Sequence, residues 1–237
     1  MIVLGSNSSS GAYQISRSVR LRSSASGYFS RTFGTPTNNK IWTWSAWVKV
    51  GKLGVMNTLF SAGSSGTVNT YFAIYNDQLF GQHSTVSFWT STAVFRDPSA
   101  WYHIVIAMDT TQSTAAYRTR IYVNGVEYSN THTPIPQNTV PYLNGAGTNA
   151  MGYFVPTSAN PFDGYLTEIN FIDGQQLTPT SFGAFDAVTG VWNPIRYSGT
   201  YGNNGFYLNF SDNSGATATT IGKDYSRSEE HTSELQL

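Results

Sequence analysis

The sequence contains no cysteine, which excludes disulfide scaffolds, thiolate metal sites and cysteine nucleophiles together. Charge is also scarce, because only 11% of the residues are Asp, Glu, Lys or Arg and the formal net charge is zero. A nucleic-acid surface needs a concentration of Lys and Arg, so we expect no nucleic-acid partner. No apolar run is long enough to cross a bilayer as a helix, so no membrane insertion is expected either.

The two ends of the sequence differ from its body. The start, MIVLGSNSSSGAYQ, has a three-residue apolar run and no basic residue, so neither a secretory signal nor a membrane anchor is expected. Near the other end, RSEEHTSELQ resembles a translated sequencing-library adapter, the alternative being a real polar tail. It holds Arg227 and three glutamates, so the 13 basic and 13 acidic residues fall to 12 and 10 without it. We therefore expect residues 1–226 to form one domain, truncated at its C-terminal end, and residues 227–237 to be a non-native tail.

Aromatic and turn-forming residues are abundant. Hydrophobic residues make up 40% of the chain and aromatic residues 15%, and there are 22 glycines, a composition that indicates a folded protein with many turns. Short stretches alternate apolar and polar residues, and no long stretch keeps a helical period. We predict an all-β sandwich or barrel with little helix, with strands at 17–22, 27–32, 42–50, 57–62, 71–75, 78–83, 87–90, 101–109, 118–123 and 165–172.

Three tryptophans lie close together in the stretch WTWSAWVK. In a strand, alternation places Trp42, Trp44, Ala46 and Val48 on one face and Trp47 on the other. The first face can enter a core, and Trp47 must find cover on the second.

Turn residues predict the connections. Asn124-Gly125 lies between β-rich arms and fits a tight, exposed type I′ turn, because Asn and Gly tolerate the two positive φ angles. Residues 129–163 are rich in Pro, Asn and Gly, and we expect long loops there. Around residues 178–183 a single helical turn with an early Pro and a Ser or Thr cap is expected.

Several segments carry a resemblance to a known family. They are WTWSAWVK, WYHIVIAMD, IYVNGVEY and FDGYLTEINFIDGQQLTP, which span Trp42 to Pro179. In order and spacing they resemble the laminin G-like members of the concanavalin A-like lectin/glucanase superfamily. The resemblance implies a jelly-roll of two packed antiparallel sheets.

A closer similarity covers most of the chain, through SRSVRLRSSASGYFSRTF, LTPTSFGAFD and YSGTYGNNGFYLNFSDNSGATATTIGKDYS. These segments are similar to lectin-like proteins of marine phages and metagenomic sequence sets, often described as tail or virion proteins. The similarity implies a non-enzymatic carbohydrate-binding or adhesion module of a phage tail or fibre. It implies a location in the virion after synthesis in the host cytoplasm, or otherwise outside the cell. The implied partners are a glycan or host surface polysaccharide, other virion proteins and further copies of the chain.

The stretch GYLTEINFIDG offers a possible catalytic motif. Glucanases of this superfamily carry Glu-x-Asp-x-x-Glu on one strand, and Glu168, Asn170 and Asp173 keep that spacing. Retaining hydrolysis needs two carboxyl groups about 5–5.5 Å apart, and Asn170 cannot carry the helper charge. Asp173-Gly174 also fits an ordinary turn. We expect no enzymatic activity, and a β-glucanase using Glu168 and Asp173 is the lesser alternative.

Histidine offers no clearer catalytic pattern. His83, His103 and His132 lack the spacing of metalloprotease ligands. His103 is expected to pack beside Trp101 as a structural residue.

Lectins of this fold bind sugars through aromatic faces and hydrogen-bonding amides or carboxylates. An uncharged surface rich in Tyr, Asn and Ser suits this mode of binding. The alternative for each residue is core or inter-strand packing. Our candidate ligand-binding residues are Tyr71, Tyr75, Asn76, Asp77, Gln82, His83, Trp89, Asn160 and Asp163.

Some members of the family bind Ca²⁺ through loop oxygens. Asp77, Asp97, Asp109 and Asp163 are candidates for such a role, although no D-x-D-x-D-G run is present and turn formation is the alternative for each. Ca²⁺ is therefore the one cofactor that the resemblance admits.

A structural virion protein without a glycan site is the competing function. It would cluster exposed aromatic residues in a flat apolar patch, whereas a glycan site would be a groove that mixes aromatic rings and amides.

Overall fold

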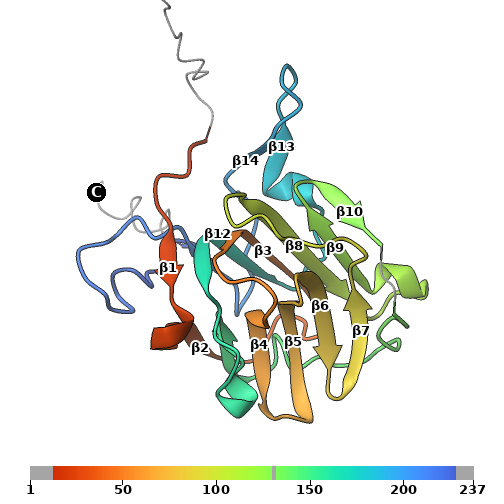
Figure 1. The fold of residues 1–237 in the computed structure, drawn as a ribbon. Coiled ribbons are helices and arrows are strands. Elements are labelled where there is room, and N and C mark those ends of the chain that lie inside the picture. Colours follow the sequence, from red (N-terminus) through yellow and green to blue (C-terminus); the bar gives the residue numbers. More distant parts are fainter. Residues whose placement is uncertain (1–12, 130–131, 228–237) are drawn as a thin grey trace, which may run out of the picture.

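The computed structural model describes residues 13–129 and 132–227, and two antiparallel sheets packed face to face dominate it (Figure 1). The seven-stranded sheet has the order β1-β12-β3-β8-β9-β10, and β15 also pairs with β12. Its strands are β1 (Val19–Leu21), β3 (Ile41–Val50), β8 (Tyr102–Asp109), β9 (Thr119–Val123), β10 (Val126–Tyr128), β12 (Gly164–Asp173) and β15 (Phe206–Leu208).

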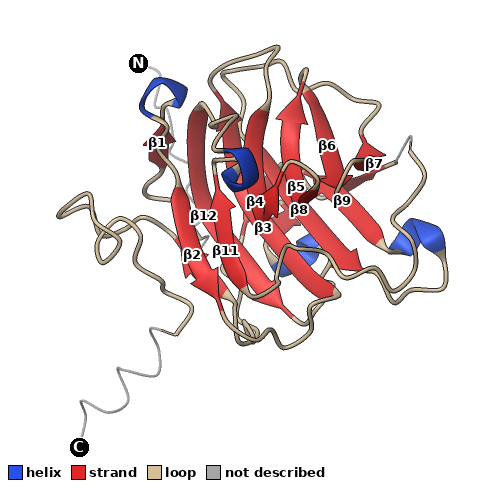
Figure 2. Cartoon of the chain, turned by 90° about the horizontal axis from the view of Figure 1, so that it is seen from below, coloured by secondary structure: helices blue, strands red, loops and turns tan. Residues whose placement is uncertain are grey.

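The second sheet has six strands in the order β2-β11-β4-β5-β6-β7 (Figure 2). They are β2 (Phe29–Phe33), β4 (Asn57–Ser65), β5 (Val68–Tyr75), β6 (Gln78–His83), β7 (Val86–Thr90) and β11 (Gly147–Met151). A separate hairpin, β13 (Gly183–Phe185) and β14 (Trp192–Pro194), projects beyond the sandwich at the top of Figure 1. Helix is limited to short 3₁₀ turns at Ser23–Ala25, Ala115–Tyr117, Val155–Thr157 and Pro179–Ser181 among the described residues. The all-β jelly-roll prediction is confirmed.

The core between the sheets follows from the alternation in β3. Trp42, Trp44, Ala46 and Val48 have no exposed surface, as the period of two predicts. Trp42 meets Phe60 of the opposite sheet edge-on, with ring centroids 6.5 Å apart. Burial of rings of this size supplies most of the hydrophobic stabilisation of a sandwich.

The outer face of the seven-stranded sheet is also covered over part of its area. Val105, Ala107 and Ile172 point away from the main core and pack with Phe182 and Tyr197 of the C-terminal segment. This third layer buries one end of the outer face and leaves the end around Trp47 partly open.

Two predictions about connections need correction. The Asn124-Gly125 turn has φ angles of 49° and 81°, as a type I′ turn requires. It is only half exposed, however, because Trp192 packs on it. Residues 129–163 are not all loop, since β11 inserts between β2 and β4 and pairs with both.

The expected helical turn around 178–183 is present as the 3₁₀ helix Pro179–Ser181. Pro occupies an early helical position as predicted, but Thr178 makes no side-chain capping bond.

Candidate functional site

Glu168 and Asp173 do not share a cleft. Asp173 lies on the core face of β12, because it continues the alternation of the core residues Ile169 and Phe171. Glu168 lies on the outer face, where its side chain contacts the hydroxyl of Tyr207 from β15. The two carboxyl groups therefore lie on opposite faces of β12. The glucanase hypothesis required both in one site, and the structure does not bring them together.

The spacing of five residues explains this arrangement, because an odd separation places two side chains on opposite faces of a strand. A β-bulge also interrupts β12. The register of β12 against β3 shifts between Thr167 and Asn170, and Glu168 has a φ of 51°. The extra residue reverses the alternation, so that Leu166 and Ile169, three positions apart, both enter the core. The register shift lies before Asn170 and not between Asn170 and Asp173, so it does not return Asp173 to the face of Glu168.

Both carboxyl groups have structural partners. Asp173 is 1% exposed and accepts hydrogen bonds from the backbone N–H groups of Thr37, Asn38 and Asn204 and from the Asn144 amide. It fastens three loops to the end of β12.

Glu168 is 6% exposed, and its Oε2 accepts hydrogen bonds from Tyr13 at 2.8 Å and Tyr207 at 2.6 Å. Burial raises the pKa of Glu168 despite those bonds. The carboxylate holds the N-terminal segment against the sheet.

Tyr71, Tyr75 and Gln82 lie on the outer face of the six-stranded sheet. His83 lies on the same side of its strand as the core residue Leu79, and most of these predicted ligand side chains are already hydrogen-bonded. The Tyr71 hydroxyl donates to Gln82, the Gln82 amide donates to the Ser84 carbonyl, and His83 pairs with Thr70 at 2.8 Å. Tyr71 is 5% exposed beneath Phe154. Tyr75, at 41% exposure, is the more accessible ring.

The remaining candidates are distributed around the molecule. Trp89 is 1% exposed and packs in the main core. Asn76 and Asp77 form the positive-φ turn between β5 and β6, and Asn160 is exposed in a loop with a φ of 50°. The structure does not gather the nine residues into one cavity, and their role as ligand contacts stays a prediction.

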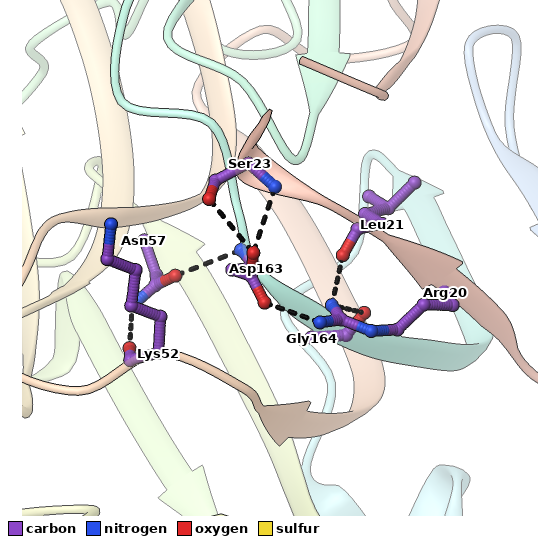
Figure 3. A network of polar contacts seen from close by, with 7 residues as sticks. All are labelled: Arg20, Leu21, Ser23, Lys52, Asn57, Asp163 and Gly164. Atoms are coloured by element: carbon purple, nitrogen blue, oxygen red, sulfur yellow. Dashed lines mark hydrogen bonds and ion pairs between the residues drawn. The ribbon is translucent and has the colours of Figure 1, made fainter. Parts of the chain in front are cut away.

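Asp163 lies at the centre of a polar network (Figure 3). Its carboxylate pairs with Arg20 at 2.6 Å and accepts hydrogen bonds from the backbone N–H and the hydroxyl of Ser23. Burial alone raises its pKa, but the Ser23 N–H and the Arg20 guanidinium outweigh that effect and hold the pKa below its usual range. This network ties β1 to the loop before β12.

The other calcium candidates have similar structural partners. Asp77 accepts from Gly54 and Arg96, Asp97 from Ser99, and Asp109 from Thr111. In residues 13–129 and 132–227, no group of three or more His, Asp and Glu side chains is placed to hold a metal ion. The four aspartates thus do not form a shared site, and a Ca²⁺ requirement stays a prediction.

A groove of about 610 Å³ lies on the outer face of the seven-stranded sheet. Its lining includes Trp47 from β3, Trp101 immediately before β8 and Trp192 from β14. The N-terminal segment 13–18 and residues 192–194 also line it. The volume is in the range of small-ligand sites. We call it the tryptophan groove.

Hydrogen-bonding groups in the tryptophan groove are available. Gln14 and Asn193 are exposed, and Trp47 and Trp101 are half-buried. Within the described residues, no hydrogen bond engages these two amides or the two indole N–H groups. The groove therefore combines aromatic faces with unused donors and acceptors, unlike the Tyr71–Gln82 face.

His103 supports two of the tryptophans. Its ring stacks on Trp47, with centroids 5.1 Å apart, and on Trp192 at 5.9 Å. The Trp192 indole donates to Nδ1, so Nε2 carries the proton and donates to Ser45. Burial lowers the pKa of His103 to about 3. The structural role expected for His103 is present, but its neighbours are Trp47 and Trp192 instead of Trp101.

Sequence reasoning missed this groove as a site. The one signal was Trp47, which alternation placed opposite the core and which therefore needed a neighbour. Trp192 and the segment 13–18 gave no comparable signal, because their proximity depends on the tertiary fold.

Comparison with known proteins identifies the family. A laminin G model described as the concanavalin A-like lectin/glucanases superfamily matches residues 23–182. The chain therefore belongs to this superfamily. A search of curated proteins finds no match.

Solved structures show the same fold. A protein of Bacteroides ovatus, described as a candidate carbohydrate-binding protein, is 17% identical with a TM-score of 0.53; the match covers 80% of this chain and 51% of that one. A heptameric SAP-like pentraxin of Limulus polyphemus is 13% identical with a TM-score of 0.54, covering 80% and 93%. The chain thus spans about half the length of the Bacteroides protein and most of the pentraxin. Among the described residues, no helix has the length and hydropathy of a membrane span.

Proposed function

We propose that this chain is a non-enzymatic carbohydrate-binding or adhesion module of a phage tail or fibre, and that the tryptophan groove is its glycan site. Membership of a lectin superfamily supports the carbohydrate class. The virion location and the virion partners rest on the resemblance to phage tail proteins.

The observation that carries the proposal is the composition of the groove. Sugars present apolar ring faces and polar hydroxyl groups, and the groove offers Trp47 and Trp101 beside the amides of Gln14 and Asn193. A groove that mixes rings and amides is the arrangement expected of a glycan site and differs from a flat apolar docking patch.

A structural virion protein remains the second candidate because of one feature. The β13–β14 hairpin exposes Phe185, Val188 and Val191, and Val188 is 94% exposed. Such an apolar tip suits contact with another protein.

The test is a glycan screen with the full chain, with and without Ca²⁺, followed by titration of Trp101→Ala and Asn193→Ala. We expect binding to fall at least about tenfold in Trp101→Ala, since buried aromatic anchors dominate binding energy. Tyr75→Ala, on the other sheet, is the matched control and should bind normally.

Loss of binding in Tyr75→Ala alone would move the site to the six-stranded sheet. No saturable binding to any bacterial or algal glycan would overturn the lectin proposal in favour of the structural one. Unchanged melting temperatures would establish that each variant is folded.

A further inference from the structure

The lining of the tryptophan groove has an unbalanced charge. Among the described residues that line it, Arg17 is charged and none is Asp or Glu. Arg17 is exposed on the segment that precedes β1. The chain as a whole has no net charge, so this local excess is a property of the site.

The segment that carries Arg17 is held in place from both sides. The Tyr13 hydroxyl donates to Glu168, and the Thr167 hydroxyl donates to the Arg17 carbonyl oxygen at 2.6 Å. Val19 then pairs with Leu166 in the sheet. The backbone of Arg17 is therefore fixed beside the groove while its side chain remains exposed.

The guanidinium of Arg17 has no partner of its own in the described part of the chain. Four other arginines are paired with carboxylates, in Arg20–Asp163, Arg31–Asp224, Arg96–Asp77 and Arg120–Glu127. A guanidinium offers a planar fork of N–H donors that matches a carboxylate or a sulfate. Arg17 is free to make that contact with a ligand.

Charges outside the lining compensate one another. Lys49, two residues beyond Trp47 on β3, interacts electrostatically with Asp97, and Arg196 interacts with Glu168. Of the residues that the structure describes, Arg17 is therefore the cation that acts on a ligand in the groove, and its charge favours anions.

We infer that the tryptophan groove selects an acidic sugar, with its ring on the indoles of Trp47 and Trp101 and its carboxylate or sulfate ester on Arg17. The inference rests on the proposed glycan function and adds the chemical class of the glycan.

The experiment compares polymers that differ only in charge. Oligogalacturonate is titrated beside its carboxyl-reduced counterpart, and a sulfated galactan beside its desulfated counterpart, against the full chain. The two pairs distinguish carboxylate from sulfate as the source of the anion. Arg17→Gln removes the proposed contact, and Arg22→Gln is the control, because Arg22 is also exposed but lies outside the groove lining.

We expect at least one acidic polymer to bind at least about tenfold more tightly than its neutral counterpart. A single hydrogen-bonded contact between charged groups supplies a difference in affinity of this size. Arg17→Gln should abolish that difference, whereas Arg22→Gln should preserve it.

Equal binding of acidic and neutral polymers would overturn the inference and leave the lectin function intact. An acid preference that survives Arg17→Gln would also overturn it. If neither these polymers nor the glycans of the broad screen bind, the glycan function itself is wrong.

Discussion

His103 is an imidazole enclosed by two indole rings. Its Nδ1 accepts the Trp192 N–H, so a second proton would remove that bond and leave a buried cation. Burial accordingly lowers its pKa to about 3. The neutral ring is a condition for the packing of Trp47 and Trp192 in the groove.

This shift predicts a dependence of stability on pH. The unfolded state binds a proton near pH 6.5 and the folded state only near pH 3, so the free energy of unfolding falls as the pH falls between them. The loss should approach about 1.4 kcal/mol per pH unit. Urea unfolding of the unmodified chain and of His103→Gln, at pH 7, 6 and 5, measures it.

The variant supplies the control for other titrating groups. The raised pKa of Glu168 acts in the opposite direction above pH 4.5, because there the folded state binds more protons than the unfolded state. The contribution of Glu168 is the same in the unmodified chain and in His103→Gln, so it cancels when the two free energies of unfolding are subtracted. Parallel stability curves for the two proteins would contradict the role of His103.

At the scale of elements, the β9–β10 hairpin is tied to the groove through one glycine. A Cβ added to Gly125 would lie 2.5 Å from ring carbons of Trp192, and its φ is 81°. Gly54 has a φ of 69°, but nothing lies within 4 Å of an added Cβ. Both glycines therefore have a positive φ that disfavours other residues, but only at Gly125 would an added Cβ clash with a neighbouring side chain.

We therefore predict that Gly54→Ala lowers the free energy of unfolding by about 1–2 kcal/mol, the cost of the left-handed backbone. Gly125→Ala should cost about 1–3 kcal/mol more, because Trp192 must move. Chemical denaturation of both variants measures the difference. Equal destabilisation would show that Trp192 is not packed on the turn.

Strands with clear alternation could be predicted from the sequence. β6 was expected at its observed bounds, and the core face of β3 followed from the positions of Trp42 and Trp44. β11 was missed because Gly147 and Asn149 have low strand propensity; it forms because β2 and β4 supply hydrogen-bond partners on both sides. The bulge at Glu168 was missed because alternation cannot show where an extra residue enters a strand.

At the scale of the molecule, the chain beyond the family match belongs to the same packing. β15 pairs with β12, and Phe206 packs on Phe171 and Phe33. The backbone of Asn204 also donates to Asp173. Residues after Phe182 thus complete the sandwich instead of forming a separate unit.

A chain that ends at Phe182 is therefore predicted to lose its cooperative unfolding transition. Removal of Phe206 and Leu208 alone forfeits about 3–6 kcal/mol of burial, a large part of the 5–15 kcal/mol typical of a domain. Circular dichroism during thermal unfolding tests this. A chain ending at Ser226 should melt like the full chain, and a normal melt of the shorter chain would contradict the prediction.

The tryptophan groove draws its walls from opposite ends of the sequence, residues 13–18 and 192–194. During translation, the first wall leaves the ribosome long before the second has been synthesised. A nascent chain consequently has no groove until residues 192–194 have left the ribosome, so the proposed glycan site forms only after both walls have been synthesised.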